Sequence, residues 1–83
     1  MKIVAYEQTF EGKPQGIVHS LRELLFNGAD ILDAEGYIRH IRRTYECVFG
    51  REMTLPDVGL DGRIRAMFAI LEEAGLMEIL DYA

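Results

Sequence analysis

The spacing of apolar residues changes along the chain and predicts strands at its two ends. Residues 2–10 are rich in β-branched and aromatic side chains and run into Glu11-Gly12-Lys13-Pro14, a turn signal, so we expect one strand there. Residues 76–82 predict a second, shorter strand after Gly75. Alternation of apolar and polar residues is weak in the first strand, which leaves its buried face undecided.

Between these strands, apolar residues recur at helical spacing in three segments. The first predicted helix covers Pro14 to Asn27, where Asn27-Gly28 is a stop signal. The second begins after an N-cap at Asp33 and ends at Gly50. Its expected apolar stripe is Ala34, Ile38, Ile41, Tyr45 and Val48.

The third predicted helix is the most apolar. It covers Gly62 to Ala74, with Asp61 as its expected N-cap, and its centre, residues 66–71, is apolar without a break. Such a helix must be covered on nearly every side, by the rest of the domain or by a second copy of the chain. The connection over residues 50–60 also carries apolar side chains, so we expect it to pack on the body.

The order of elements is strand, three helices, strand. It predicts an α+β fold, a three-helix core with a small sheet formed by the N-terminal and C-terminal strands (β-α-α-α-β). At 83 residues the chain is one small domain, residues 1–83. Because small domains bury little surface, a homodimer or other homo-oligomer is compatible with this sequence.

Composition narrows the class of protein. The chain is 49% hydrophobic and 28% charged, which excludes a disordered or low-complexity chain. No apolar run reaches the ~18 residues of a membrane span, so we expect no membrane partner. The first seven residues lack the apolar core of a signal peptide, and we therefore expect a cytoplasmic protein.

Charge is segregated along the chain. The net charge is −5, but residues 37–65 hold six arginines against four carboxylates, while both ends are acidic. An acidic protein with a basic middle favours a protein partner over a nucleic acid. The candidate partner-binding residues are Tyr37, Arg39, Arg42, Arg43, Arg51, Arg63 and Arg65.

The same spacings allow a plain salt-bridged surface. Glu35 lies four residues before Arg39, and Arg42 four before Glu46, so part of the positive charge can be neutralised along the helix.

Residues 61–80 also resemble, in a general way, the end of a winged-helix domain. The resemblance implies nucleic-acid binding, but the gap between the second and third helices is too long for a helix-turn-helix, and too few residues follow Gly75 for a wing.

Catalytic chemistry has little support. Cys47 is the only cysteine, and we expect it to be buried and inert. It lies two helical turns from His40, too far for a nucleophile and its base. His19 and Glu23 are spaced as a surface pair. We assign no catalytic, cofactor-binding or metal-binding residue, and the carboxylate clusters do not match a calcium loop.

These observations predict a non-enzymatic protein-protein interaction module, a regulator, adaptor or inhibitor. It would dock through the arginines of the second helix or through apolar surface near the third. The alternative is a divergent helix-turn-helix-like nucleic-acid-binding domain that uses Arg39, Arg43, Arg63 and Arg65. An enzyme would need a pocket gathering groups from several elements, which spacing alone does not show.

Overall fold

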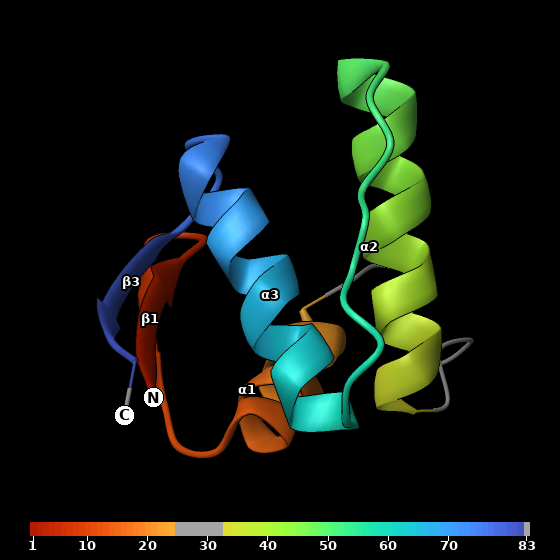
Figure 1. Cartoon of the computed structure of the whole chain (residues 1–83). Coiled ribbons are helices and arrows are strands. Elements are labelled where there is room, and N and C mark those ends of the chain that lie inside the picture. The colour runs from red at the N-terminus through yellow and green to blue at the C-terminus, as the bar shows by residue number, and fades with distance from the viewer. Residues whose placement is uncertain (25–32, 83) are drawn as a thin grey trace.

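A computed structural model of the chain describes residues 1–24 and 33–82. It confirms the α+β fold: three helices and a three-stranded antiparallel sheet (Figure 1). In chain order the elements are β1 (Lys2–Ala5), β2 (Gln8–Glu11), α1 (Pro14–Glu23), α2 (Ala34–Phe49), α3 (Leu60–Glu73) and β3 (Glu78–Asp81).

The two ends of the described chain meet in the sheet, as predicted. The strand order is β2-β1-β3, and β1 pairs with both neighbours in antiparallel fashion. Ile3 lies opposite Ile79, and Val4 lies opposite Glu78. Ile3 and Ile79 are both buried, so the same pair that closes the sheet also places apolar side chains on its helix-covered face.

The prediction of a single strand over residues 2–10 is wrong. The segment folds back at Tyr6-Glu7 and forms the hairpin of β1 and β2, with Ala5 opposite Gln8. Tyr6 and Glu7 both have positive φ, 53° and 63°. Tight hairpins need this backbone shape, which Asn-Gly supplies with little strain, and this sequence offers no such signal.

Pro14 begins α1, and both ends of α2 follow the predicted capping residues. Pro14 is in the first turn of α1, and the helix is described as far as Glu23; the predicted stop at Asn27-Gly28 lies outside the described residues. Asp33 caps α2, because its Oδ1 accepts a hydrogen bond of 2.8 Å from the Gly36 N–H. Gly50 ends α2 in the left-handed conformation, with φ 64°.

The predicted cap of the third helix is wrong. α3 begins two residues earlier than expected, at Leu60, and extended Gly59 occupies the cap position without a side-chain hydrogen bond. Asp61 lies inside the first turn instead. Its Oδ1 accepts a hydrogen bond of 3.1 Å from Gln15 Nε2, which links the start of α3 to α1.

α3 lies between the sheet and α2 and forms the middle of the core (Figure 1). Ile64, Met67, Phe68 and Leu71 are buried, whereas Ala69 is exposed, so the chain's own elements cover most of this helix. Met53 is also buried, which confirms that the connection between α2 and α3 packs on the body. Of the helices in the described ranges, none combines the length and the apolarity needed to cross a bilayer.

The cationic face of α2 and the pocket behind it

Four of the seven candidate partner-binding residues either bind another residue of this chain or are buried. Arg63 donates to Glu35 through both terminal guanidinium nitrogens, with the Nη1 contact at 2.8 Å, and Arg65 donates to the carbonyl oxygen of Tyr82. Arg42 lies 3.7 Å from Glu46 and 4.0 Å from Glu52. The fourth, Tyr37, is buried, with 2% of its surface exposed. These four side chains are therefore committed to the fold or to its interior.

The Arg63–Glu35 ion pair joins the first turns of α2 and α3. The hydrogen bond from Arg63 lowers the pKa of the Glu35 carboxyl, and the charges of Arg63 and Arg39 lower it further. The same hydrogen bond raises the pKa of Arg63. Glu35 thus pairs mainly with a residue 28 positions away in sequence, rather than with Arg39 one turn along its own helix.

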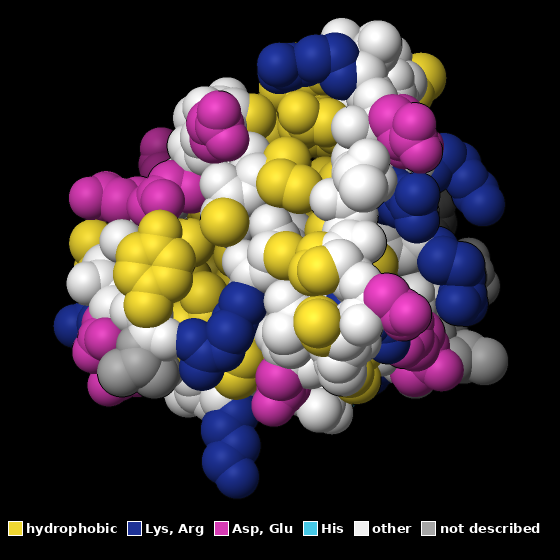
Figure 2. All heavy atoms as spheres, in the orientation of Figure 1, with side chains coloured by type: hydrophobic (Ala, Val, Ile, Leu, Met, Phe, Trp, Pro, Cys, Tyr) yellow, Lys and Arg dark blue, Asp and Glu magenta, His cyan; other side chains and the backbone are white. Residues whose placement is uncertain are grey.

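The remaining three arginines share one exposed surface, which we call the α2 outer face. It consists of Arg39, His40, Arg43, Thr44, Cys47, Val48 and Arg51, all exposed. Residues 39, 43 and 47 form one row at steps of four, and residues 40, 44 and 48 form the next. Figure 2 shows basic side chains gathered along the α2 edge of the molecule.

The arginines of the α2 outer face are exposed and are not held in direct ion pairs by the described part of the chain. Within residues 1–24 and 33–82, Arg39, Arg43 and Arg51 make no hydrogen bond or ion pair. The guanidinium carbon of Arg51 lies 5.8 Å from the centre of the Phe49 ring, a cation–π distance. No member of this face is acidic. The face is therefore suited to an anionic partner.

Cys47 corrects one sequence-based expectation. It is exposed, not buried, because it belongs to the same surface row as Arg39 and Arg43. Val48 was placed in the apolar stripe, yet it is 70% exposed, the most exposed of the large hydrophobic residues described. The helix is turned so that Tyr37 faces inward and Val48 lies at the edge of its packed surface.

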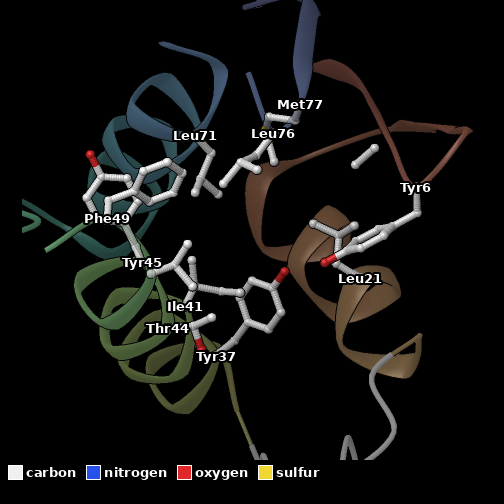
Figure 3. Close-up of a pocket in the computed structure, with 12 residues that line it drawn as sticks. Tyr6, Leu21, Tyr37, Ile41, Thr44, Tyr45, Phe49, Leu71, Leu76 and Met77 are labelled. Carbon is white, nitrogen blue, oxygen red and sulfur yellow. The ribbon is translucent and has the colours of Figure 1, made fainter. Parts of the chain in front are cut away.

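An apolar pocket of about 260 Å³ lies behind the α2 outer face. One wall is α2, and the other is built from the β1–β2 turn, α1, the end of α3 and the segment before β3 (Figure 3). Figure 2 shows apolar side chains exposed between the upper ends of α2 and α3. The lining residues are Ala5, Tyr6, Leu21, Tyr37, Ile41, Thr44, Tyr45, Val48, Phe49, Leu71, Leu76 and Met77.

Tyr6 and Tyr37 supply two phenol hydroxyls to this pocket. In Figure 3 both hydroxyl oxygens point toward the middle of the pocket from opposite walls. Neither hydroxyl makes a hydrogen bond within the described residues. Burial raises the pKa of Tyr37, and the nearby Tyr6 phenol raises it further, so Tyr37 remains a protonated donor. Thr44 is the other polar lining residue, and its hydroxyl donates to the His40 carbonyl at 2.9 Å.

No pattern in the sequence predicts this pocket. Its lining comes from five separate parts of the chain, and periodicity within any one of them gives no sign of it. The sequence gives one indirect indication of the pocket: the aromatic Tyr6 and the aliphatic Leu76 lie at turns, where polar residues are usual.

Residues 1–24 and 33–82 contain no candidate metal site. No cluster of three His, Cys, Asp or Glu side chains there could hold a metal ion. His19 lies 3.3 Å from Glu23, which confirms the predicted surface pair, and its other ring nitrogen lies 3.1 Å from Arg22. The chain matches no protein-family model, no curated protein and no solved structure.

Proposed function

We propose that this chain is a non-enzymatic interaction module that docks another protein through the α2 outer face. The partner contributes an acidic segment that carries at least one apolar side chain. One observation supports this most directly: Arg39, Arg43 and Arg51 are exposed and make no hydrogen bond or ion pair within the described residues, in a chain whose net charge is −5. Charge segregated in this way favours one orientation of approach and excludes cationic partners.

Arginine is suited to such a surface. Its planar guanidinium binds a carboxylate through two parallel hydrogen bonds and is less strongly hydrated than a lysine ammonium. Arg39 and Arg43 are one turn apart, a spacing that matches two carboxylates on a docked helix or strand. Val48 adds an exposed apolar contact at the edge of the same face. The partner segment is therefore both acidic and amphipathic.

A protein partner fits this surface better than a nucleic acid does. The face offers three arginines that make no ion pair in residues 1–24 and 33–82, whereas Arg63 and Arg65, which the nucleic-acid hypothesis also needs, are engaged with Glu35 and the Tyr82 carbonyl. Both ends of the chain are acidic and would repel a phosphate backbone. We therefore treat duplex binding as an outcome to test.

The test is a titration of purified chain with a peptide selected from a displayed library of short peptides. Arg39→Glu with Arg43→Glu should weaken binding at least about tenfold, because two attractive pairs become repulsive. The matched control is Lys2→Glu with Lys13→Glu, which changes the net charge equally on other elements and should alter affinity less than about twofold. Circular dichroism checks that both double variants fold.

Three outcomes would overturn the proposal. The first is an equal effect of the two double variants on peptide affinity. The second is binding of random duplex DNA that falls steeply as salt rises and is lost with Arg39→Glu and Arg43→Glu, which would show the nucleic-acid alternative. The third is a dimer in light scattering that dissociates on the same substitutions, which would make a second copy the occupant of this face.

A further inference from the structure

The pocket between α2 and the β1–β2 turn has the properties of a small-ligand site. A dry cavity of about 150 Å³ accepts a benzene-sized ring, and this pocket measures about 260 Å³. It therefore has room for a ring or short chain with a small substituent, on the order of ten non-hydrogen atoms. Its walls are almost wholly apolar, so the body of the ligand must be apolar too.

The Tyr37 hydroxyl is a hydrogen-bond donor that lines the pocket. The side chain is 2% exposed, yet its hydroxyl makes no hydrogen bond within the described residues. Figure 3 shows the Tyr37 hydroxyl directed into the pocket that this side chain lines. Buried hydroxyls are rarely left unpaired, because their desolvation is unfavourable. The pocket therefore favours an occupant that accepts this hydrogen bond.

Tyr6 supplies a second hydroxyl from the opposite wall. Its backbone lies in the left-handed region, φ 53°, which is unfavourable for a large side chain and holds the ring at the pocket. Two donors that converge on one point match an oxygen with two lone pairs, the carbonyl group. A carboxylate fits less well, because no basic side chain lines the pocket to balance its charge.

We infer that this pocket binds a small apolar carbonyl compound whose oxygen accepts hydrogen bonds from Tyr37 and Tyr6. The inference goes beyond the proposed docking function, because it uses the hydroxyls of Tyr37 and Tyr6 and none of the three arginines; Thr44 and Val48 border both the pocket and the α2 outer face. Leu21, Ile41 and Leu71 surround the apolar body of the ligand.

The test uses two probes of nearly equal shape, acetophenone and ethylbenzene, which differ in the carbonyl oxygen. Each is titrated into the isotope-labelled full chain, and dissociation constants are obtained from backbone amide shifts. Both probes should bind the wild-type chain. Tyr37→Phe should weaken acetophenone about fivefold or more and leave ethylbenzene within about twofold, because one hydrogen bond is lost and the apolar contacts remain. Tyr6→Phe, at an exposed position, should produce the same selective loss of acetophenone affinity at about threefold, again with ethylbenzene within about twofold.

Tyr82→Phe is the matched control, since the Tyr82 hydroxyl donates to Glu72 at 2.8 Å, away from the pocket. It should change the affinity of neither probe. Equal weakening of both probes by Tyr37→Phe, or no weakening, would overturn the carbonyl assignment. Failure of both probes to bind the wild-type chain would overturn the site itself. Arg39→Glu with Arg43→Glu should leave acetophenone binding unchanged, so failure of the docking proposal and failure of this inference are separate results.

Discussion

The two ends of the α2–α3 pair differ in how they are held together. At the first turns of both helices, Glu35 and Arg63 form a two-contact ion pair, and Asp33 caps α2. At the far ends, Leu71 and Phe49 face a pocket, and Val48 is largely exposed. At the first end, which we call the closed end, the side chains of Glu35 and Arg63 are in direct contact. At the far end, which we call the open end, a pocket separates the two helices.

This difference teaches where binding can occur in a small domain. A closed end uses its side chains to stabilise the fold, so Glu35 and Arg63 have little capacity left for a partner. The open end keeps apolar surface and the hydroxyls of Tyr6 and Tyr37, which make no hydrogen bond to any residue that the structure describes. Loss of packing there lowers stability but provides concave surface, which is where ligands bind.

The largest expected effect contrasts two core truncations. Ile64→Ala, at the closed end, should lower the free energy of unfolding by about 3–4 kcal/mol, because Ile64 is fully buried and its neighbours leave a cavity. Leu71→Ala should cost only about 2 kcal/mol, because Leu71 already borders a pocket. Urea denaturation measures both values. Equal losses would show that the far end is packed as tightly as the near end.

A smaller effect concerns the turn that forms one rim of the pocket. Glu7→Gly should raise the free energy of unfolding by about 0.5–1 kcal/mol, because glycine adopts φ 63° without the strain that glutamate has. Gln8→Gly, one residue later in β2, is the control and should be destabilising, since glycine weakens a strand. Thermal melting of the two variants checks the contrast, and destabilisation by Glu7→Gly would argue against strain in this turn.

The smallest effect is the pH dependence of the closed end. The folded-state pKa of Glu35 is below its ordinary value of 4.5, so the unfolded state takes up a proton first as the pH falls. The stabilisation from Glu35 is therefore complete above about pH 5 and is lost as the pH falls through the folded pKa. Solvent exposure of the pair keeps this contribution modest.

Melting temperatures of wild type and Glu35→Gln at about pH 6 and about pH 3 test this dependence. The difference between the two proteins should be present at the higher pH and should shrink toward zero at the lower one. Glu72, whose pKa is lowered by hydrogen bonds from the Ile79 N–H and the Tyr82 hydroxyl, is common to both proteins and cancels in the comparison. A constant difference would show that the closed end does not depend on the Glu35 charge.

The sequence predicted helix ends correctly where a single residue determines the local backbone conformation. Asp33 and Gly50 marked the two ends of α2 correctly, because capping depends on a side chain and a φ angle within a few residues. Asp61 failed as a cap, since Gly59 already occupied that position. The Tyr6-Glu7 turn was missed because its residues disfavour the conformation that the sheet imposes on them.

The candidate site was predictable only in part. Arg39, Arg43 and Arg51 were identified from charge, but whether each arginine is free depends on distant partners: Glu35 for Arg63 and the Tyr82 carbonyl for Arg65. Tyr37 was chosen as a surface aromatic and is instead a pocket wall. Helical spacing tells which residues share a face, but it does not tell what that face meets.

The sequence by itself determined the α+β class, the ends of α2 and the pairing of the chain ends, because periodicity, caps and strand propensity act over short distances. Only the tertiary structure decided which arginines stay unpaired and where Tyr6 and Tyr37 meet. Those features depend on side chains that are far apart in sequence and come within reach only when α2, α3 and the sheet are packed together.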